Sequence, residues 1–551
     1  MVAAIIPAAG KGTRMLPMTE NTPKCMLPIG GKPIIYYQIK QLIDNNITDV
    51  WIVVNYKKDV IIDYVNFVFK DKINLHFVEQ IELNGLLGAI KTSIEDIRNY
   101  NCFDSSFIYL SDILVEDNSI FDFTHDYISY EKVEDFSRWC LLDLDDTDKI
   151  ISFNDKPNVE PIKKNAIIGA YYFSNLDYLY ECILNVFDNN IKIKNEFQLS
   201  SALAIYINKV DVYGRNVEHW FDFGELDSYI RSSKKFNSSR FFNSIKFEDD
   251  CITKTSTNYH KLQNEICWFL TAPNKYNPNL IDYSMDDSNT FYKLDYINGI
   301  SLSDMWVNFN ISEEKWLMIF RKLSEIFKYF YENSNKDFGK VDLFQFICKN
   351  LDSRLNDIDN EVVKNILNND IILNNKHLVC FNRIKDILLD KLNNIRYCDK
   401  RIIHGDMVFS NIIYSEGLDK LYLIDPRGNF NGDIIYGDYR YDLAKIYQCI
   451  YGNYDLIKGN LFKLKHNTDE FELDFYLGDN ENVDKLMKIL DPNIDINDIK
   501  LITAFQFITM ISLHRDEPKH QIAMALIATK LFNEILNTSY KETYTDVFRH
   551  I

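Results

Sequence analysis

The sequence lacks the usual marks of a disulfide-bonded, zinc-binding or nucleic-acid-binding protein. Its ten cysteines are scattered over 551 residues and none belongs to a CxxC pair. That pattern argues against a disulfide framework or a zinc site and indicates reduced thiols, as in cytosolic proteins. The formal net charge is −19 and no basic patch is evident, so DNA or RNA is not expected as a partner. We therefore expect a cytoplasmic protein that does not bind nucleic acid.

Long apolar runs and internal repeats are lacking as well. No run approaches the roughly 20 apolar residues that a membrane helix requires, so no membrane insertion is expected. The apolar start MVAAIIPAAG is short and leads directly into a glycine-containing loop, which favours a buried first strand over a signal peptide. No repeat of about 20 to 50 residues is visible, which argues against a solenoid or a propeller.

The chain does have the length and the apolar content for two or more domains. It exceeds the size at which single cores stop growing, and 46% of its residues are hydrophobic. Residues 1–235 alternate short apolar runs with a helical spacing, which predicts an α/β domain with a parallel sheet. The expected strands are AAIIPAAG, DVWIVVN, INLHFVEQ and SSFIYLSD, and the expected helix between the first two is PIIYYQIKQLIDNN.

The pattern changes after a polar stretch at residues 231–240, which we take as the domain junction. In the second domain, residues 236–551, the segment FNSIKFEDDCITKTST predicts antiparallel strands and KLQNEICWFL predicts a helix. From about residue 311 long helical patterns dominate, for example EEKWLMIFRKLSEIFKYFYEN.

A loop of small residues, Pro7 to Arg14, follows the first expected strand. Small residues allow backbone N–H groups to approach phosphate oxygens, and such loops bind ligands at the carboxyl ends of strands. Arg14 and Lys24 would add positive charge for a triphosphate. Taken alone, the loop is equally typical of a glycine turn before a helix. It is not a P-loop, because that motif requires Gly-Lys followed directly by Ser or Thr.

The segment IIPAAGKGTRMLPMTENTPKCMLPIGGKPII resembles the opening of the sugar-1-phosphate nucleotidyltransferases, especially the glucose-1-phosphate uridylyl- and thymidylyltransferases. Further motifs follow in the family's order. They are Gln80 with Gly85, Ser111-Asp112, Asn154-Asp155-Lys156-Pro157, Ile168-Gly169-Ala170-Tyr171, Asn195-Glu196-Phe197-Gln198-Leu199-Ser200 and Trp220-Phe221-Asp222-Phe223-Gly224. The resemblance implies a Rossmann-like nucleotidyltransferase domain.

The resemblance also implies roles for individual residues. The expected nucleotide-binding residues are Ala8, Ala9, Gly10, Gly12, Thr13, Gln80 and Gly85, of which the last two read the base. The expected catalytic residues are Arg14 and Lys24, the expected metal ligands are Asp112 and Asp222, and the expected acceptor contacts are Asp155, Lys156, Gly169 and Glu196. The sequence departs from the family at Ser111 and Asn195, which replace glycine, and at Asp155, which replaces glutamate. Asp155 and Asn195 lie near the expected acceptor and leave its identity open.

The chemistry of such a domain suits these residue types. A phosphate oxygen of the acceptor attacks the α-phosphorus of a nucleoside triphosphate, and pyrophosphate leaves. The nucleophile is already anionic, so the catalyst needs no base and must instead screen the repulsion between anions. Mg²⁺ on Asp112 and Asp222, together with Arg14 and Lys24, would provide that screening. Asp112 by itself could equally cap the end of a strand.

A second constellation begins at His404. The segment from His404 to Asn411 has the His-x-Asp-x-x-x-x-Asn spacing of kinase catalytic loops, in which the Asp accepts the proton of the substrate hydroxyl and the Asn binds Mg²⁺. Asp406 is thus the expected base, Asn411 a metal ligand, and Asp425, fourteen residues later at a strand end, a second metal ligand. Lys254 and Glu265 are candidates for the Lys–Glu pair that positions the ATP phosphates, although a lysine in a strand is often merely solvated.

This second half resembles the aminoglycoside phosphotransferase and choline kinase superfamily. Tyr296-Ile297-Asn298-Gly299 is similar to its segment after the hinge, and Tyr441-Asp442-Leu443-Ala444 to its helix after the metal-binding Asp. The resemblance implies an α+β, two-lobed, protein-kinase-like domain that acts on a small substrate. A glycine-rich loop over the phosphates is missing, since FNSIKFEDD contains no glycine.

Together the two sites predict a bifunctional enzyme. The second domain would use ATP to phosphorylate a small molecule, and the first would transfer a nucleotidyl group to that phosphate, with Mg²⁺ as the cofactor of both. The product would be a nucleotide-activated precursor, of a sugar type, for capsule or other surface glycans. One alternative is a choline or ethanolamine kinase fused to a phosphocholine-type cytidylyltransferase, and another is that one domain is a degenerate, regulatory module. The nucleotide base, the acceptor and the oligomeric state stay open, and an oligomer is possible.

Overall fold

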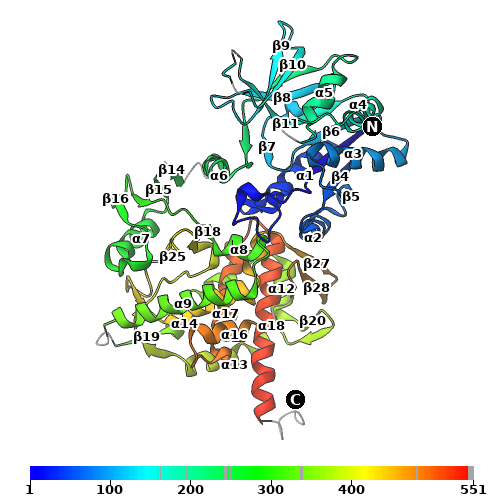
Figure 1. The fold of residues 1–551 in the computed structure, drawn as a ribbon. Coiled ribbons are helices and arrows are strands. Elements are labelled where there is room, and N and C mark those ends of the chain that lie inside the picture. The colour runs from blue at the N-terminus through cyan, green and yellow to red at the C-terminus, as the bar shows by residue number, and fades with distance from the viewer. Residues whose placement is uncertain are drawn as a thin grey trace. The chain divides into compact units, whose positions relative to one another are not determined.

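The structure, a computed structural model, describes residues 1–157, 159–161, 163–193, 196–240, 245–248, 250–335, 339–478 and 482–543. The chain forms two compact units (Figure 1). The first comprises residues 1–240 with 308–310, and the second comprises residues 241–307 and 311–551. The polar stretch 231–240, which we take as the domain junction, forms the last ten residues of the helix α6 (Leu226–Arg240), and the first unit ends with that helix.

The first unit is built on a mixed sheet with a parallel core. Its main strand order is β10-β9-β11-β6-β1-β4-β5, with β8 paired to β11 and β12 paired to β8. The four expected strands are all present and mutually parallel, as β1 (Val2–Pro7), β4 (Asp49–Val54), β5 (Asn74–Glu79) and β6 (Ser105–Tyr109). The others are β8 (Tyr127–Lys132), β9 (Cys140–Leu144), β10 (Ile150–Asp155), β11 (Asn165–Phe173) and β12 (Tyr213–Asn216). The α/β prediction for the first domain is confirmed.

Apolar side chains project from both faces of this sheet and are buried on both. This explains the unbroken apolar run of the first strand. Ala3 and Ile5 of β1 share a core with Ile90 and Ile94 of α3, whereas Ala4, next to Ala3 in the strand, is equally buried and points to the other face. The helices of this unit are α1 (Ile34–Asp44), α2 (Lys58–Phe69), α3 (Gly85–Ile97), α4 (Leu176–Asp188), α5 (Leu199–Tyr206) and α6.

The parallel arrangement brings distant parts of the sequence to one edge. The loops that follow β1, β5 and β6 all leave the carboxyl ends of neighbouring parallel strands, where open α/β sheets bind ligands. A short antiparallel pair, β7 (Ile113–Val115) and β13 (Trp220–Asp222), continues from the loop after β6. A second short pair is β2 (Pro28–Ile29) and β3 (Lys32–Pro33).

The second unit begins with a small antiparallel sheet of order β14-β15-β17-β16 and one helix. The elements are β14 (Ile245–Phe247), β15 (Cys251–Thr255), α7 (Tyr259–Thr271), β16 (Leu280–Ser284) and β17 (Phe291–Asp295). The expected strand pair and the expected helix are therefore both present. A three-stranded sheet contains β18 (Ile300–Ser301), β24 (Ile412–Ser415) and β25 (Lys420–Leu423). The segment that begins at His404 leads into β24, and Asp425 follows the end of β25.

Helices dominate the rest of this unit, as the sequence predicts. They are α8 (Leu302–Asn308), α9 (Glu313–Asn333), α10 (Leu343–Cys348), α11 (Leu351–Asn356), α12 (Glu361–Asn368), α13 (Phe381–Asn394), α14 (Tyr439–Ile450), α15 (Tyr454–Lys458), α16 (Val483–Leu490), α17 (Ile496–Met510) and α18 (Pro518–Thr543). Two short strand pairs lie between the helices, β19 (Lys340–Asp342) with β22 (Tyr397–Asp399) and β23 (Arg401–Ile402) with β26 (Tyr436–Gly437). A separate four-stranded sheet contains β20 (Ile371–Leu373), β21 (Lys376–Leu378), β27 (Phe462–His466) and β28 (Glu470–Phe475).

One helical segment departs from the expectation that no stretch is long and apolar enough to cross a membrane. Ile496–Leu513, which comprises α17 and the turn after it, passes that test with 18 residues of mean hydropathy 1.3. Most of this segment, 61%, is buried inside the protein, and α17 packs against α14 and α18. We interpret it as the central core helix of the second unit, since a helix that is apolar all round is a buried one.

Candidate functional sites

The loop after β1 has the open backbone that phosphate binding requires. The N–H of Ala8 donates to the Val53 carbonyl at 2.8 Å, so the sheet pairing continues into the loop. Gly12 has a φ of +62°, and its carbonyl accepts the Thr19 hydroxyl at 2.8 Å. No heavy atom lies within 4 Å of a Cβ placed on Gly10, so that side of the loop is open. Ala8 and Ala9 are buried, and Thr13 begins a short 3-10 turn.

Gln80 and Gly85 form the neighbouring loop, after β5. Gln80 is 4% exposed, and its side-chain amide donates to the Gly85 carbonyl at 3.1 Å. Gly85 has a φ of +76° and begins α3. Gln80 therefore fixes the turn that starts the helix, and a left-handed φ at this turn favours glycine.

The two predicted metal ligands of the first unit come together. Asp222 ends β13, which pairs with β7 immediately after Asp112, and the N–H of Phe223 donates to the Asp112 carbonyl at 2.9 Å. A Cβ placed on Gly224 would lie 2.8 Å from Oδ1 of Asp222 and 3.9 Å from Oδ2 of Asp112. Two strands separated by more than 100 residues in the sequence therefore aim both carboxylates at one small space beside a glycine.

Lysine and arginine side chains compensate this pair of like charges. Lys24 Nζ lies 2.7 Å from Oδ2 of Asp112 and donates to the Gly224 carbonyl at 2.8 Å. Arg138 Nη2 lies 2.8 Å from Oδ2 of Asp222, and its Nη1 lies 3.4 Å from Glu225. Sequence reasoning missed Arg138, because no motif marks it and 84 residues separate it from Asp222.

Arg14, the other predicted catalytic cation, lies on the outer side of this group. Its Nη1 is 3.1 Å from Glu225 Oε1, and its side chain is 74% exposed. Glu225 thus bridges Arg14 and Arg138. Of the two predicted catalytic cations, Lys24 contacts a predicted metal ligand directly and Arg14 does not. An exposed arginine of this kind can turn towards a bound phosphate at little cost.

The donor set of Asp112 and Asp222 suits Mg²⁺. Among the described residues no group of three or more His, Cys, Asp or Glu side chains could hold a metal by itself. Mg²⁺ does not require one, because it is typically held by one or two carboxylates together with substrate phosphates and water. The convergence of the two carboxylates beside Gly224 therefore fits a metal that arrives with a nucleotide.

The predicted acceptor residues are only partly brought together. Asp155, at the end of β10, accepts the Ser200 hydroxyl of α5 at 2.8 Å. The next residue, Lys156, has a φ of +48° and donates its N–H to the Trp139 carbonyl at 2.8 Å. Gly169 has a φ of +112°, and a Cβ there would lie 2.8 Å from Leu110, so a side chain does not fit.

Glu196 stands apart from these residues in its described contacts. It accepts from Gln198 at 2.8 Å and pairs with Ile193 through the backbone. Asn195, the departure from the family pattern beside it, lies outside the described residues. The acceptor end of the first site is consequently the part where the motifs and the geometry agree least.

In the second unit, Lys254, Glu265 and Asp425 meet as one charged cluster. Lys254 Nζ lies 2.7 Å from Glu265 Oε2 and 3.0 Å from Asp425 Oδ1. The Tyr292 hydroxyl, which sequence reasoning missed, is 2.9 Å from the same Glu265 oxygen. Burial lowers the pKa of Lys254, but the charges of Asp425 and Glu265 outweigh it and the pKa is raised. The lysine is therefore a charged group held between two carboxylates rather than a solvated one.

Helix α14 holds the start of the predicted catalytic loop, His404–Asn411, in place. Asp442 accepts the backbone N–H groups of His404 at 2.7 Å and of Gly405 at 2.8 Å. His404 is buried, and its Nε2 lies 2.9 Å from the Ile424 carbonyl, one residue before Asp425. Burial raises the pKa of Asp442 to about 7. These bonds fix the loop backbone on which Asp406 stands.

Asp406 faces a lysine that the sequence did not indicate. Lys445 of α14 lies 3.1 Å from Asp406 Oδ1, and its side chain is 8% exposed while that of Asp406 is 41% exposed. Asn411 donates to the Asp406 carbonyl at 2.9 Å, and the Ile424 N–H donates to the Asn411 carbonyl at 3.0 Å. Burial would raise the pKa of Asp406, but Lys445 outweighs it and the pKa is lowered. The cluster thus joins Asp406, Asn411 and the strand end at Asp425.

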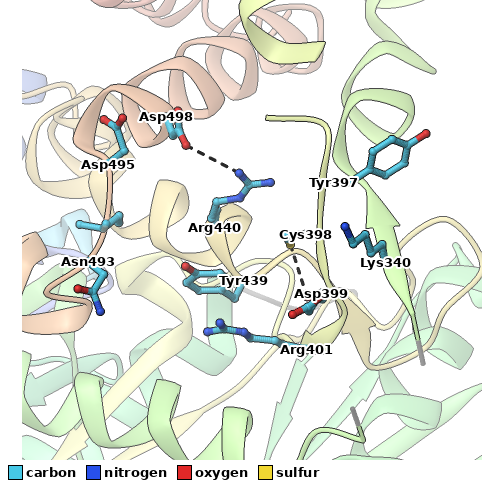
Figure 2. A pocket seen from close by; sticks show the side chains of 11 residues that line it. Lys340, Tyr397, Cys398, Asp399, Arg401, Tyr439, Arg440, Asn493, Asp495 and Asp498 are labelled. Carbon is cyan, nitrogen blue, oxygen red and sulfur yellow. Dashed lines mark hydrogen bonds and ion pairs between the residues drawn. The ribbon is translucent and has the colours of Figure 1, made fainter. Parts of the chain in front are cut away.

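A polar cavity of about 440 Å³ lies elsewhere in the second unit (Figure 2). Its walls include Arg401, Tyr439, Arg440 and Asp498, and it contains none of the predicted site residues. Arg440 pairs with Asp438 at 2.7 Å and with Asp498 at 3.8 Å, so most of its charge is met inside the protein. We interpret this network as the support of the first turn of α14, the helix that supplies Asp442 and Lys445.

The turn after Asp425 depends on Gly428. This glycine has a φ of +67°, and a Cβ on it would lie 2.0 Å from the Asn264 carbonyl oxygen of α7. We expect Gly428→Ala to destabilise the second unit beyond the roughly 1–2 kcal/mol that a left-handed φ costs an ordinary residue, because the helix backbone must also move. Calorimetric melting measures the effect.

Gly432→Ala is the matched control for this substitution. Gly432 also has a positive φ, of +96°, but no atom lies within 4 Å of its Cβ position. Equal losses of melting temperature for Gly428→Ala and Gly432→Ala would contradict the close contact with α7.

Comparisons with known proteins concern the first unit. Residues 3–239 match the family model described as nucleotidyl transferase. The chain is 31% identical over 235 residues to the bifunctional protein GlmU of Methanocaldococcus jannaschii, with 42% of this chain and 53% of that protein covered. It is 27% identical over 226 residues to the UTP–glucose-1-phosphate uridylyltransferase AglF of Haloferax volcanii, with 39% and 86% covered. The chain spans about half the length of the GlmU proteins it matches.

Among solved structures, one similar chain is a UDP-glucose pyrophosphorylase complexed with UDP-glucose, at 23% identity and a TM-score of 0.38, covering 44% of this chain and 100% of that chain. Another is a putative glucose-1-phosphate thymidylyltransferase from Bacillus anthracis, at 20% identity and a TM-score of 0.37, covering 45% and 98%. Each of these matches covers less than half of this chain. The family match coincides with the unit that holds Asp112, Asp222, Lys24 and the open loop after β1, and residues 3–239 are a nucleotidyl transferase domain.

Proposed function

We propose that the chain is a bifunctional enzyme that performs two consecutive phosphate-transfer steps. The second unit phosphorylates a small hydroxyl compound of a sugar or sugar-like type with ATP. The first unit then transfers a nucleotidyl group from a nucleoside triphosphate to that phosphate and releases pyrophosphate. The nucleotide-activated product would serve the cytoplasmic supply of precursors for capsule or other surface glycans.

The convergence of Asp112 and Asp222, matched by Lys24 and Arg138, supports the first step. An acceptor phosphate oxygen forms a bond to the α-phosphorus, the bond from that phosphorus to the bridging oxygen breaks, and pyrophosphate leaves. Every participant is an anion, so the useful groups are fixed positive charges rather than a base. Mg²⁺ held by the two carboxylates would neutralise phosphate charge when bound. The names of the relatives, which act on sugar phosphates, favour a sugar phosphate as the acceptor.

Within the first unit, the chain's own residues would divide the work. Gly10 and Gly12 open the loop to the triphosphate, and Gln80 fixes the turn beside the base. Lys24, 2.7 Å from Asp112, would contact the transferring phosphate beside the two carboxylates that would hold Mg²⁺. Arg14, on the exposed side, would meet the outer phosphates.

The cluster of Lys254, Glu265 and Asp425 supports the second step, and it is the observation that carries the kinase proposal. Glu265, whose side chain is 2% exposed, requires a charged partner. Lys254 provides that partner and also contacts Asp425, so the three side chains meet from α7, β15 and the end of β25. This is the Lys–Glu and Asp arrangement that positions ATP in kinases. Asn411 and Asp425 would hold Mg²⁺, for which amide and carboxylate oxygens are suitable ligands. Asp406, with 41% of its side chain exposed, can receive the acceptor's proton.

The same cluster supports catalysis over a purely regulatory second unit. A binding module needs neither an accessible carboxylate at Asp406 nor a buried lysine that compensates it at 3.1 Å. The lack of a glycine-rich loop is the one feature that favours a regulatory module. The missing loop would affect the binding of the nucleotide and not the reacting groups.

Asp112→Asn and Asp222→Asn should each abolish formation of the nucleotide-activated product and leave phosphorylation intact, because each removes one charge from the metal pair. Product formation is measured by mass spectrometry with the pre-made acceptor phosphate, and phosphorylation by ADP release. Asp188→Asn, at the exposed end of α4, is the matched control. If both variants kept most of their nucleotidyl transfer, the metal assignment would be wrong.

Lys24→Ala should lower kcat/KM for nucleotidyl transfer. The loss of a charge-assisted phosphate contact costs about 1.5–3 kcal/mol, which corresponds to roughly 10- to 150-fold in rate. Lys40→Ala removes an exposed lysine that pairs only with Asp44 of its own helix, and should change nothing. An unchanged rate in Lys24→Ala at normal thermal stability would leave Lys24 as a structural partner of Asp112.

Asp406→Asn should eliminate phosphorylation while ATP still binds, because the amide keeps the size of the side chain and removes its basicity. General-base contributions are typically about 10²- to 10⁴-fold. The variant is supplied with the free acceptor or with its pre-made phosphate, and the nucleotide-activated product is measured. We expect no product from the free acceptor and the wild-type rate from the phosphate.

Two outcomes of this experiment would contradict the proposal. Turnover of the free acceptor by Asp406→Asn would mean that Asp406 is not the base. A wild-type chain that phosphorylates its acceptor but cannot use the resulting phosphate in the first unit would separate the two activities into unrelated reactions.

A further inference from the structure

Three aromatic side chains form a platform beside the catalytic-loop segment. Phe346 of α10 stacks on Phe430 with a centroid distance of 3.6 Å, and Tyr441 of α14 meets both rings edge to face at 5.2 and 5.5 Å. These rings come from three separate parts of the chain, so their packing joins α10 and α14 to the segment after Asp425. The platform is therefore part of the tertiary packing that positions the segment after Asp425.

Arg427 lies on this platform, next to the predicted base. Its guanidinium carbon is 4.8 Å from the centre of the Phe346 ring, and its Nη1 donates to the Tyr441 hydroxyl at 3.3 Å. Its Cβ would be 2.8 Å from a Cβ on Gly405, which directly precedes Asp406. The arginine thus lies against the catalytic-loop backbone, held by rings that leave its charge unmet.

No described carboxylate lies within ion-pair distance of Arg427, and its side chain is exposed. By contrast, the carboxylates around it already have partners. Asp406 has Lys445, and Asp425 has Lys254. A guanidinium that is oriented by aromatic stacking and lacks a carboxylate offers its planar fork to an oxyanion from outside.

The same arrangement disfavours a quaternary ammonium acceptor. Such ligands are bound by free aromatic faces, but the protein's own Arg427 covers Phe346, and both Arg427 and Lys445 lie about 5.9 Å from the Tyr441 ring centre. A cation placed beside Asp406 would also face the positive charges of Lys445 and Arg427. Both the local charge and the aromatic packing therefore disfavour a cationic acceptor.

We propose that Arg427 binds an oxyanion of the acceptor, so that the second unit phosphorylates hydroxyl compounds that carry a carboxylate or a phosphate group. This rests on the proposed kinase function and narrows its substrate class. The ATP phosphates are the other possible source of an oxyanion. They already have Lys254, which approaches Asp425 from β15, whereas the side-chain contacts of Arg427 are with α10, α14 and Gly405.

In the reaction, the acceptor's O–H bond breaks and its proton passes to the Asp406 carboxylate. The acceptor oxygen forms a bond to the γ-phosphorus of ATP, the bond from that phosphorus to the bridging oxygen breaks, and ADP leaves. Arg427 takes no proton and forms no bond. It holds the far oxyanion of the acceptor, and is a specificity-determining residue.

The test compares matched acceptors that differ only in charge. Glycerate is paired with glycerol, glucuronate and glucose 6-phosphate are paired with glucose, and choline represents the cations. Binding to the chain in the presence of ADP and Mg²⁺ is measured by calorimetry, and ADP release gives kcat/KM for each acceptor and for ATP. We expect the best anionic member to exceed its neutral partner by about 10-fold or more, the scale of a charged hydrogen bond.

Arg427→Met should remove this preference while KM for ATP stays within about two-fold, and Arg427→Lys should restore part of it. Arg401→Met is the matched control, because Arg401 also stacks on aromatic rings, Tyr331 at 4.7 Å and Tyr439 at 3.9 Å, but lines the separate cavity. The carboxylate and phosphate members of the panel show which oxyanion is preferred.

The outcomes separate the two proposals. A chain that neither binds ATP nor phosphorylates any member of the panel defeats the kinase function itself. A chain that binds ATP but does not prefer the anionic members, or that prefers choline, overturns the acceptor assignment alone. An Arg427→Met variant that keeps the preference, or that loses affinity for ATP instead, overturns the role given to Arg427.

Discussion

The constraint on which both sites depend is the cost of bringing like charges together. Asp112 and Asp222 converge in the first unit, and Glu265 and Asp425 approach the same lysine in the second. An unpaired carboxylate in such a place would take up a proton or push the chain apart. Lysine and arginine side chains prevent this in each site. Phosphates and Mg²⁺ bring the same two signs of charge, so the carboxylates and cations of each site match the charges of the ligands proposed for it.

The fold determines which side chains can meet at such a point. Parallel strands place the loops after β1, β5 and β6 at one edge, and β13 then returns to pair with β7 and brings Asp222 beside Asp112. In the second unit the same result comes from an antiparallel sheet, α7 and the strand β25.

Local patterns predicted the strands, the acidic residues and two of their counterions, Lys24 and Lys254, but not the other cations. The parallel strands and α1 follow from apolar runs and spacing, and Asp112, Asp222, Asp406 and Asp425 each follow a strand or lie in a recognisable loop. Arg138 and Lys445 lie in no motif of that kind. Each meets its partner only because two distant elements pack together, for example α14 under the catalytic loop. The polar stretch at 231–240 ends where the first unit ends, but its composition did not reveal that it is helical, because polar helices and connecting segments have similar composition.

The overall charge of −19 does not conflict with the two sites proposed to bind polyanions. Exposed charges farther apart than about 8–10 Å are largely screened at physiological ionic strength. A phosphate therefore responds to Lys24, Arg138 or Arg427 within a few ångströms and hardly to the acidic surface beyond. Local cations, rather than the net charge, would decide which anions are bound. The proposed selectivity for small phosphates and oxyanions therefore depends on a few positions whose charge is not neutralised by the chain itself. Among the residues discussed, Arg427 meets that condition most fully, since no described carboxylate forms an ion pair with it.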